Sequence, residues 1–189
     1  YFANGLVSQL ESVGLTALPL HCDNYYRSRY EPDPMDGFDT VNAIDIDALL
    51  VDVLSARDRT LTRLRQYDMQ SRAVDYRPID DRFLSDGYDL IVVEGAYGPQ
   101  HLVNDFPFLL VIYLEESVPR RLWRRLRRDV RDRHRSPRYV IRQMFREMLP
   151  GERHFIEPLK QNASVVIRDQ SMGLGQVLAL LGSVDPDNV

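Results

Sequence analysis

The sequence predicts an α/β fold in which helices cover both faces of a parallel sheet. Residues 89–95 (DLIVVEG) and 108–115 (FLLVIYLE) are almost continuously apolar, as strands buried on both faces are. Segments with helical periodicity alternate with these strands, which is typical of parallel βαβ units. The 189 residues, 44% of them hydrophobic, are enough for a full core. Because neither a repeat nor a linker divides the chain, we expect residues 1–189 to form a single domain.

The remaining elements follow from their own patterns. Residues 1–14 carry an apolar residue about every four positions, and Gly14 predicts the end of that helix. From 57 to 88 the pattern is weak and polar, and Pro78 interrupts it, so no element is predicted there. The other expectations are strands at 16–23 and 163–167, a long loop at 24–44, and helices at 45–56, 138–149 and 174–182.

A strongly basic helix follows the strand at 108–115. Nine arginines lie between positions 120 and 135, while every fourth residue from 118 to 130 is apolar. A guanidinium is always charged and directs two donors toward a phosphate, which suits the binding of a nucleotide tail. The alternative is a solvated basic face. One stripe at helical spacing contains Arg121, Arg125 and Arg128.

The composition indicates which binding partners and which cellular compartment to expect. The net charge is −4, and residues 120–146 form the strongly basic stretch of the chain. An acidic balance with the basic charge concentrated in one helix argues against an extended groove for nucleic acid. Cys22 is the only cysteine, so no intrachain disulfide can form and a reducing compartment is expected. There is neither an apolar run of 18 residues nor a signal-peptide pattern at the N-terminus. We expect a cytoplasmic protein with no membrane partner, and a homo-oligomer is left open.

Two predicted strands end in an acidic residue, namely Asp23 and Glu94. Ligands of open parallel sheets bind beyond the carboxyl ends of the strands. A carboxylate there can coordinate Mg²⁺ or accept a proton from a hydroxyl, and phosphoryl transfer requires both. Each acid could instead cap a turn or a helix. Together with the arginine helix, however, the two acids favour a phosphoryl-transfer site.

Five segments match one family pattern in the right order. DNYY (23–26) corresponds to D-S-F-Y, GFDTVNAID (37–45) to N-F-D-H-P-D-A-F-D, VVEG (92–95) to a strand ending in E-G, RRLRRDVRDRHR (124–135) to R-R-x-x-R-D-x-x-x-R-G-R, and FIEPLKQNASVVI (155–167) to F-x-x-P-T-K-x-x-A-D-x-I-I. The chain therefore resembles the phosphoribulokinase/uridine kinase family of P-loop kinases, from Tyr1 to Arg168. The resemblance implies a P-loop kinase-like fold with an arginine-rich lid.

The resemblance also implies an ATP-dependent kinase that uses Mg²⁺ and a small-molecule acceptor such as a nucleoside. Closure of the lid would exclude water and protect the phosphoryl donor from hydrolysis. The implied roles are as follows: Asp23 is the base that takes the proton of the acceptor hydroxyl and a metal ligand, Glu94 is a metal ligand, Asp39 binds ribose hydroxyls, Arg128 and Arg133 bind nucleotide phosphates, and Arg125, Arg135 and Gln143 reach the acceptor or its leaving phosphates.

The chain departs from the family pattern at the phosphate loop. No G-x-x-x-x-G-K-[ST] segment occurs, and the family places that loop immediately before the helix that begins at Tyr1. We expect the native polypeptide to extend upstream with a central strand and this loop. A protein that truly began at Tyr1 would not be expected to act as a kinase, and a non-catalytic nucleotide- or metabolite-binding relative is the alternative.

The base-recognition segment is also altered. Uridine kinases have Y-D-F-x-x-H-S-R, whereas this chain has YDMQSR (67–72), which is two residues shorter, lacks the histidine and has Met69 for phenylalanine. Tyr67 is retained and can stack on a base, so it is a candidate substrate-binding residue. The acceptor is therefore open between a pyrimidine nucleoside and a related alcohol, such as a sugar phosphate or pantothenate. His134 replaces the glycine of the lid pattern.

Overall fold

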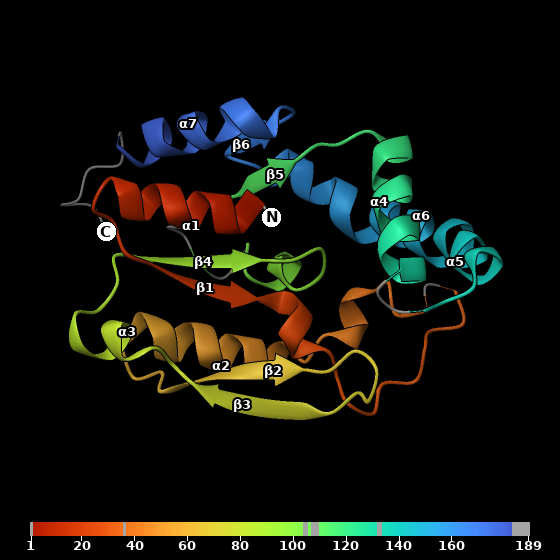
Figure 1. The fold of residues 1–189 in the computed structure, drawn as a ribbon, viewed down its shortest axis with the longest axis horizontal. Helices are drawn as coiled ribbons and strands as arrows, with labels where there is room; N and C mark the ends of the chain where they lie inside the picture. The colour runs from red at the N-terminus through yellow and green to blue at the C-terminus, as the bar shows by residue number, and fades with distance from the viewer. Residues whose placement is uncertain (1, 36, 104–105, 107–109, 132–133, 183–189) are drawn as a thin grey trace.

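The computed structural model describes residues 2–35, 37–103, 106, 110–131 and 134–182. Helices and strands alternate along most of the chain, as Figure 1 shows. The strands are β1 (Ala17–His21), β2 (Arg63–Tyr67), β3 (Val74–Pro78), β4 (Leu90–Glu94), β5 (Ile112–Leu114) and β6 (Val165–Ile167). The α-helices are α1 (Phe2–Ser12), α2 (Ile46–Arg57), α3 (Asp81–Ser85), α4 (Val118–Arg131), α5 (Pro137–Gln143), α6 (Leu149–Gly151) and α7 (Gln170–Leu181).

Parallel strand pairs confirm the predicted α/β class. β1 pairs with β4 so that His21 lies opposite Glu94, and β5 pairs with β6. In Figure 1, β1, β4 and β5 all point toward the side of the molecule where α4, α5 and α6 lie. The two parallel pairs are separate sheets in the described part of the chain. The central strand expected upstream of Tyr1 stays a prediction.

An antiparallel hairpin, β2–β3, occupies a region where the sequence pattern predicted no element. The pattern is weak because the buried positions of β2 are Leu64 and Arg65, an apolar residue next to a charged one. Arg65 is only 6% exposed and forms an ion pair with Asp45 at 3.1 Å. Its guanidinium also donates to the main-chain oxygens of Asn24 and Tyr26. A buried arginine satisfied by distant partners cannot be recognised from hydrophobic alternation.

Other boundaries differ in length from the predictions. The strand expected at 108–115 is ordered as β5 over 112–114, and residues 107–109 lie outside the described ones. The helix expected at 138–149 continues beyond α5 through π-helical turns (Met144–Met148 and Glu152–Ile156) to a 3₁₀ helix that ends at Asn162. The loop expected at 24–44 carries short 3₁₀ helices at Cys22–Tyr25 (η1) and Val41–Ala43 (η2).

Three apolar clusters hold these elements together. One joins α2, β1 and the β2–β3 hairpin. A second joins α1 and α7 to β1, β4, β5 and β6. In the third, the apolar face of α4 (Leu122, Leu126 and Val130) packs against Val140, Met144 and Met148 of the following helical segment. This packing turns the arginines of α4 away from the cluster. No helix among the described residues combines the length and apolarity needed to cross a membrane.

Candidate active site

A cavity of about 650 Å³ brings together residues from η1, the β2–β3 hairpin, α4 and α5. Most of the site residues predicted from the sequence line it, although they are up to about 120 positions apart in the chain. Glu94 is not on its wall, and Arg133 lies outside the described residues. The predicted residues that share the cavity are Asp23, Asp39, Tyr67, Arg125, Arg128, Arg135 and Gln143.

The two strand-end acids lie at the carboxyl ends of paired strands. Asp23 belongs to η1, which directly follows β1, and its side chain is exposed. Glu94 is the last residue of β4, and its Oε1 lies 2.6 Å from Nδ1 of His21 on β1. The hydrogen bond with His21 lowers the pKa of Glu94 below its ordinary value, although partial burial opposes this effect. Glu94 is therefore a carboxylate at neutral pH.

The oxygen donors at these strand ends suit Mg²⁺. No group of three or more His, Cys, Asp or Glu side chains with metal-binding geometry occurs within the described ranges. Mg²⁺ is usually held by one or two carboxylates, with substrate phosphates and waters completing the octahedron. Asp23 and Glu94 are two oxygen-donor residues at adjacent strand ends, so they fit an ion that arrives with a nucleotide.

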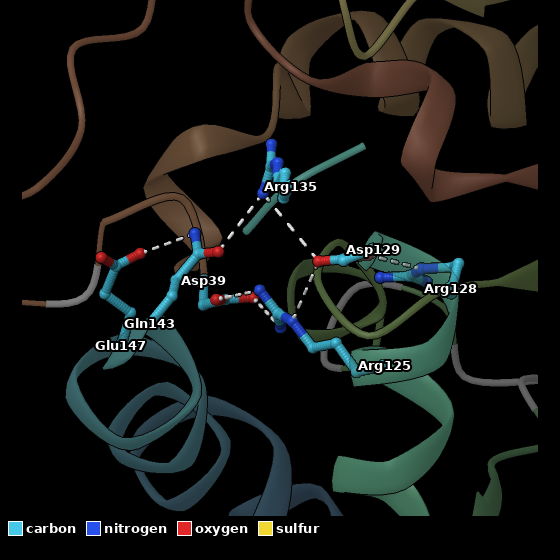
Figure 2. Close-up of polar contacts among 7 residues, drawn as sticks. All are labelled: Asp39, Arg125, Arg128, Asp129, Arg135, Gln143 and Glu147. Atoms are coloured by element: carbon cyan, nitrogen blue, oxygen red, sulfur yellow. Dashed lines mark hydrogen bonds and ion pairs between the residues drawn. The ribbon is translucent and has the colours of Figure 1, made fainter. Parts of the chain in front are cut away.

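Asp39 and Arg125, which both line the cavity, form a buried ion pair. The two oxygens of Asp39 accept hydrogen bonds of 2.9 and 2.8 Å from the two terminal nitrogens of Arg125, as Figure 2 shows. Asp39 is 7% exposed. Burial acts to lower the pKa of Arg125, but the ion pair with Asp39, together with the nearby charge of Asp129, more than offsets this and raises the pKa above its ordinary value. The pair ties α4 to the loop before η2.

Asp129 lies among the arginines of α4 and was not among the site residues predicted from the sequence. Its side chain is fully buried. Arg128 Nε donates to it at 3.0 Å, and nitrogens of Arg125 and Arg135 lie 3.8 and 3.9 Å from its Oδ2 (Figure 2). The buried carboxylate therefore orients Arg128 through a hydrogen bond and attracts the other two guanidinium groups by charge alone. In the sequence, Asp129 could be noticed only as a single acid within a basic helix, four residues after Arg125.

Polar contacts on the helix after α4 complete this wall. Gln143 accepts a hydrogen bond of 3.3 Å from Arg135 and donates one of 3.0 Å to Glu147. Arg121 forms an ion pair with Glu152. Burial raises the pKa of Glu152, while Arg121 acts in the opposite direction. No motif marked Glu152 in the sequence, because its role depends only on where the π-helical turn places it.

Part of the cavity wall, formed by Tyr26, Tyr67 and Phe38, is aromatic. The rings of Tyr26 and Tyr67 lie 5.7 Å apart, and the Arg72 guanidinium lies 4.7 Å above the Phe38 ring. Tyr67 was predicted from the sequence as a site residue, whereas Phe38 and Arg72 were not. Phe38 immediately precedes Asp39, and Arg72 ends the altered YDMQSR segment, so both were next to motifs already recognised. Met69 also lines the cavity.

The wall of the cavity is strongly positive. Eight arginines line it, compared with three acids (Asp23, Asp39 and Glu152). Such an excess of positive charge attracts anionic ligands and neutralises charge that develops on them. The arginines are Arg72, Arg121, Arg124, Arg125, Arg127, Arg128, Arg131 and Arg135.

Comparison with known proteins finds similar sequences over most of the chain. Residues 20–174 match the family model described as "Phosphoribulokinase / Uridine kinase family". The chain is also similar to the uridine kinases of Staphylococcus aureus strains JH9, Newman and JH1. It is 27% identical to each over 173 residues, which cover 87% of this chain and 78% of the relative. His134, which replaces the lid glycine of the family pattern, has a φ of 53°, a left-handed value that glycine adopts more easily.

Proposed function

Because this chain belongs to the phosphoribulokinase/uridine kinase family, we propose that it is an ATP-dependent kinase for a hydroxyl of a nucleoside or a related small alcohol. The observation that carries the proposal is the single cavity that combines a strand-end acid with a wall of arginines. The name of the S. aureus relatives supports a uridine- or cytidine-like acceptor. A cytoplasmic location suits a chain whose one cysteine is buried and free.

Asp23 is the proposed general base. Its side chain is exposed and lines the cavity, so an acceptor hydroxyl can reach it. The carboxylate would accept the hydroxyl proton as the oxygen attacks the γ-phosphorus, and the bond to the leaving phosphate would break on the opposite side. Asp39, held by Arg125, would accept hydrogen bonds from ribose hydroxyls and fix the acceptor in place.

The arginines of α4 would neutralise the phosphates. In phosphoryl transfer, negative charge spreads over the transferring group, and prearranged cations stabilise it. Asp129 orients Arg128 toward this role, and Arg135 and Gln143 hold the adjoining wall. Asp23 and Glu94 would hold Mg²⁺, which when bound supplies further positive charge to the transferring group.

The test is ADP release by the full-length polypeptide with Mg-ATP and a panel of uridine, cytidine, pantothenate and ribulose 5-phosphate. Asp23→Asn should lower kcat by about 10²- to 10⁴-fold and leave the dissociation constant for ATP nearly unchanged. Asp47→Asn, on the exposed first turn of α2, is the matched control and should retain full activity. Unchanged turnover in Asp23→Asn would remove that residue as the base. ATP binding without transfer to any acceptor would favour the non-catalytic relative.

A further inference from the structure

We propose that Arg72 determines acceptor specificity by selecting molecules whose far end presents two adjacent hydrogen-bond acceptor atoms. The cytosine edge of cytidine is one such group, and a carboxylate or phosphate is another. Uracil is disfavoured. This inference rests on the proposed kinase function and narrows the class of its substrate.

The turn between β2 and β3 holds Arg72 in place. Asp68 Oδ1 accepts hydrogen bonds of 2.7 Å from the main-chain nitrogens of Gln70 and Ser71, and Arg72 N donates to Asp68 O at 2.8 Å. Arg72 itself has a φ of 59°, a left-handed conformation that is uncommon for residues other than glycine. Non-glycine residues in such conformations persist only where the surrounding structure imposes them, and they cluster at ligand-binding sites.

The surroundings of Arg72 leave its donors available to a ligand. Its guanidinium lies 4.7 Å above the Phe38 ring and lines the cavity with Tyr67 and Met69. Arg121 and Arg125 on the same wall are held in ion pairs, whereas Arg72 has no carboxylate partner among the residues that the structure describes. A cation–π contact does not use up the five N–H donors of a guanidinium, so Arg72 can still donate hydrogen bonds to a ligand.

A guanidinium can donate hydrogen bonds but cannot accept them. Cytosine offers N3 and O2 as neighbouring acceptors, which match two donors of the fork. Uracil carries N3–H at the same position, so one donor would face another donor and both would lose hydration without gaining a partner. Stacking on Tyr67 does not discriminate between cytosine and uracil, because each base has a π face. Arg72 is therefore the cavity residue suited to distinguish them.

The experiment compares kcat/KM for cytidine and uridine in the full-length protein. One good bidentate contact discriminates by about 5- to 150-fold, so we expect cytidine to be preferred within that range. Arg72→Ala should bring the ratio close to one through a loss of cytidine use. Arg72→Lys, which keeps the charge but loses the fork, should lose most of the preference. Arg63→Ala is the matched control, because Arg63 lies on the same hairpin, 4.2 Å over the Tyr76 ring and away from the cavity.

Two further measurements keep this inference separate from the proposed function. Pantothenate and ribulose 5-phosphate test whether Arg72 binds a carboxylate or a phosphate instead of a base. If the enzyme prefers one of these two acceptors and Arg72→Ala abolishes that preference, Arg72 has the proposed role with a different acceptor. Dissociation constants for cytidine and uridine from calorimetry test recognition without turnover. Equal use or equal binding of the two nucleosides, with neither acidic acceptor preferred, would overturn the role of Arg72 while leaving the kinase intact. A ratio that Arg72→Ala does not change would also overturn it.

Discussion

The Asp39–Arg125 pair should make a large contribution to stability, because neither charge has ready access to water. Their side chains are 10% and 16% exposed, and the two hydrogen bonds measure 2.9 and 2.8 Å. Removing one partner of a buried pair costs about 3–5 kcal/mol, since the other charge stays buried without compensation. Asp39→Ala leaves Arg125 with Asp129 at 3.8 Å, so we expect the lower end of that range. For a chain of this size, about 3 kcal/mol lowers Tm by about 6–12 °C.

The assay is a double-mutant cycle by urea unfolding with Asp39→Ala, Arg125→Ala and the double variant. We expect a coupling free energy of about 2–3 kcal/mol. The matched control is the Arg82–Glu11 pair, which has the same 2.9 Å separation but side chains that are 50% and 38% exposed. Its coupling should stay below about 1 kcal/mol. A coupling for Asp39–Arg125 no larger than that of the exposed pair would refute the argument from burial.

Two further predictions concern packing and pH. A Cβ at Gly151 would lie 2.1 Å from the main-chain oxygen of Asp39, so Gly151→Ala should cost about 1–3 kcal/mol. In contrast, Gly175→Ala in α7 meets nothing within 4 Å and should gain up to about 1 kcal/mol; equal shifts in Tm would contradict the close contact. Burial raises the pKa of Asp52 above its ordinary 3.8, although the hydrogen bond from Tyr25 opposes this. The folded state therefore holds that proton more tightly and loses stability as the pH rises from about 4 through the folded pKa. The free energy of unfolding of Asp52→Asn, measured relative to the wild type, should increase over that interval; a difference independent of pH would show that Asp52 is not shifted.

Local sequence patterns predicted an element correctly wherever its buried positions are apolar and follow the regular spacing of a helix or strand. Continuous apolar runs predicted β4, and helical periodicity predicted α1 and the packing face of α4. They failed for β2, because Arg65 fills a buried position that only its pairing with Asp45 makes tolerable. Burial of a charge depends on a partner, and its partner lies 20 positions away in the sequence.

The same division applies to the candidate site. The motifs indicated which residues to consider, since strand-end acids and a basic helix can be recognised from order and composition. They could not show that Asp39 and Arg125, 86 positions apart, form one ion pair, or that the buried Asp129 accepts a hydrogen bond from Arg128. The motifs also could not show that Glu94, which ends its strand as predicted, does not line the cavity.

The sequence by itself therefore determined the fold class, the family resemblance and seven of the residues that line the cavity, because each depends on residue types at short, ordered spacings. Only the tertiary structure decided the ion pairs of the wall and the position of Arg72 over Phe38. The physical reason is that hydrogen bonds, ion pairs and ring contacts act over a few ångströms of space. Separation along the chain does not set those distances until the helices and strands have packed.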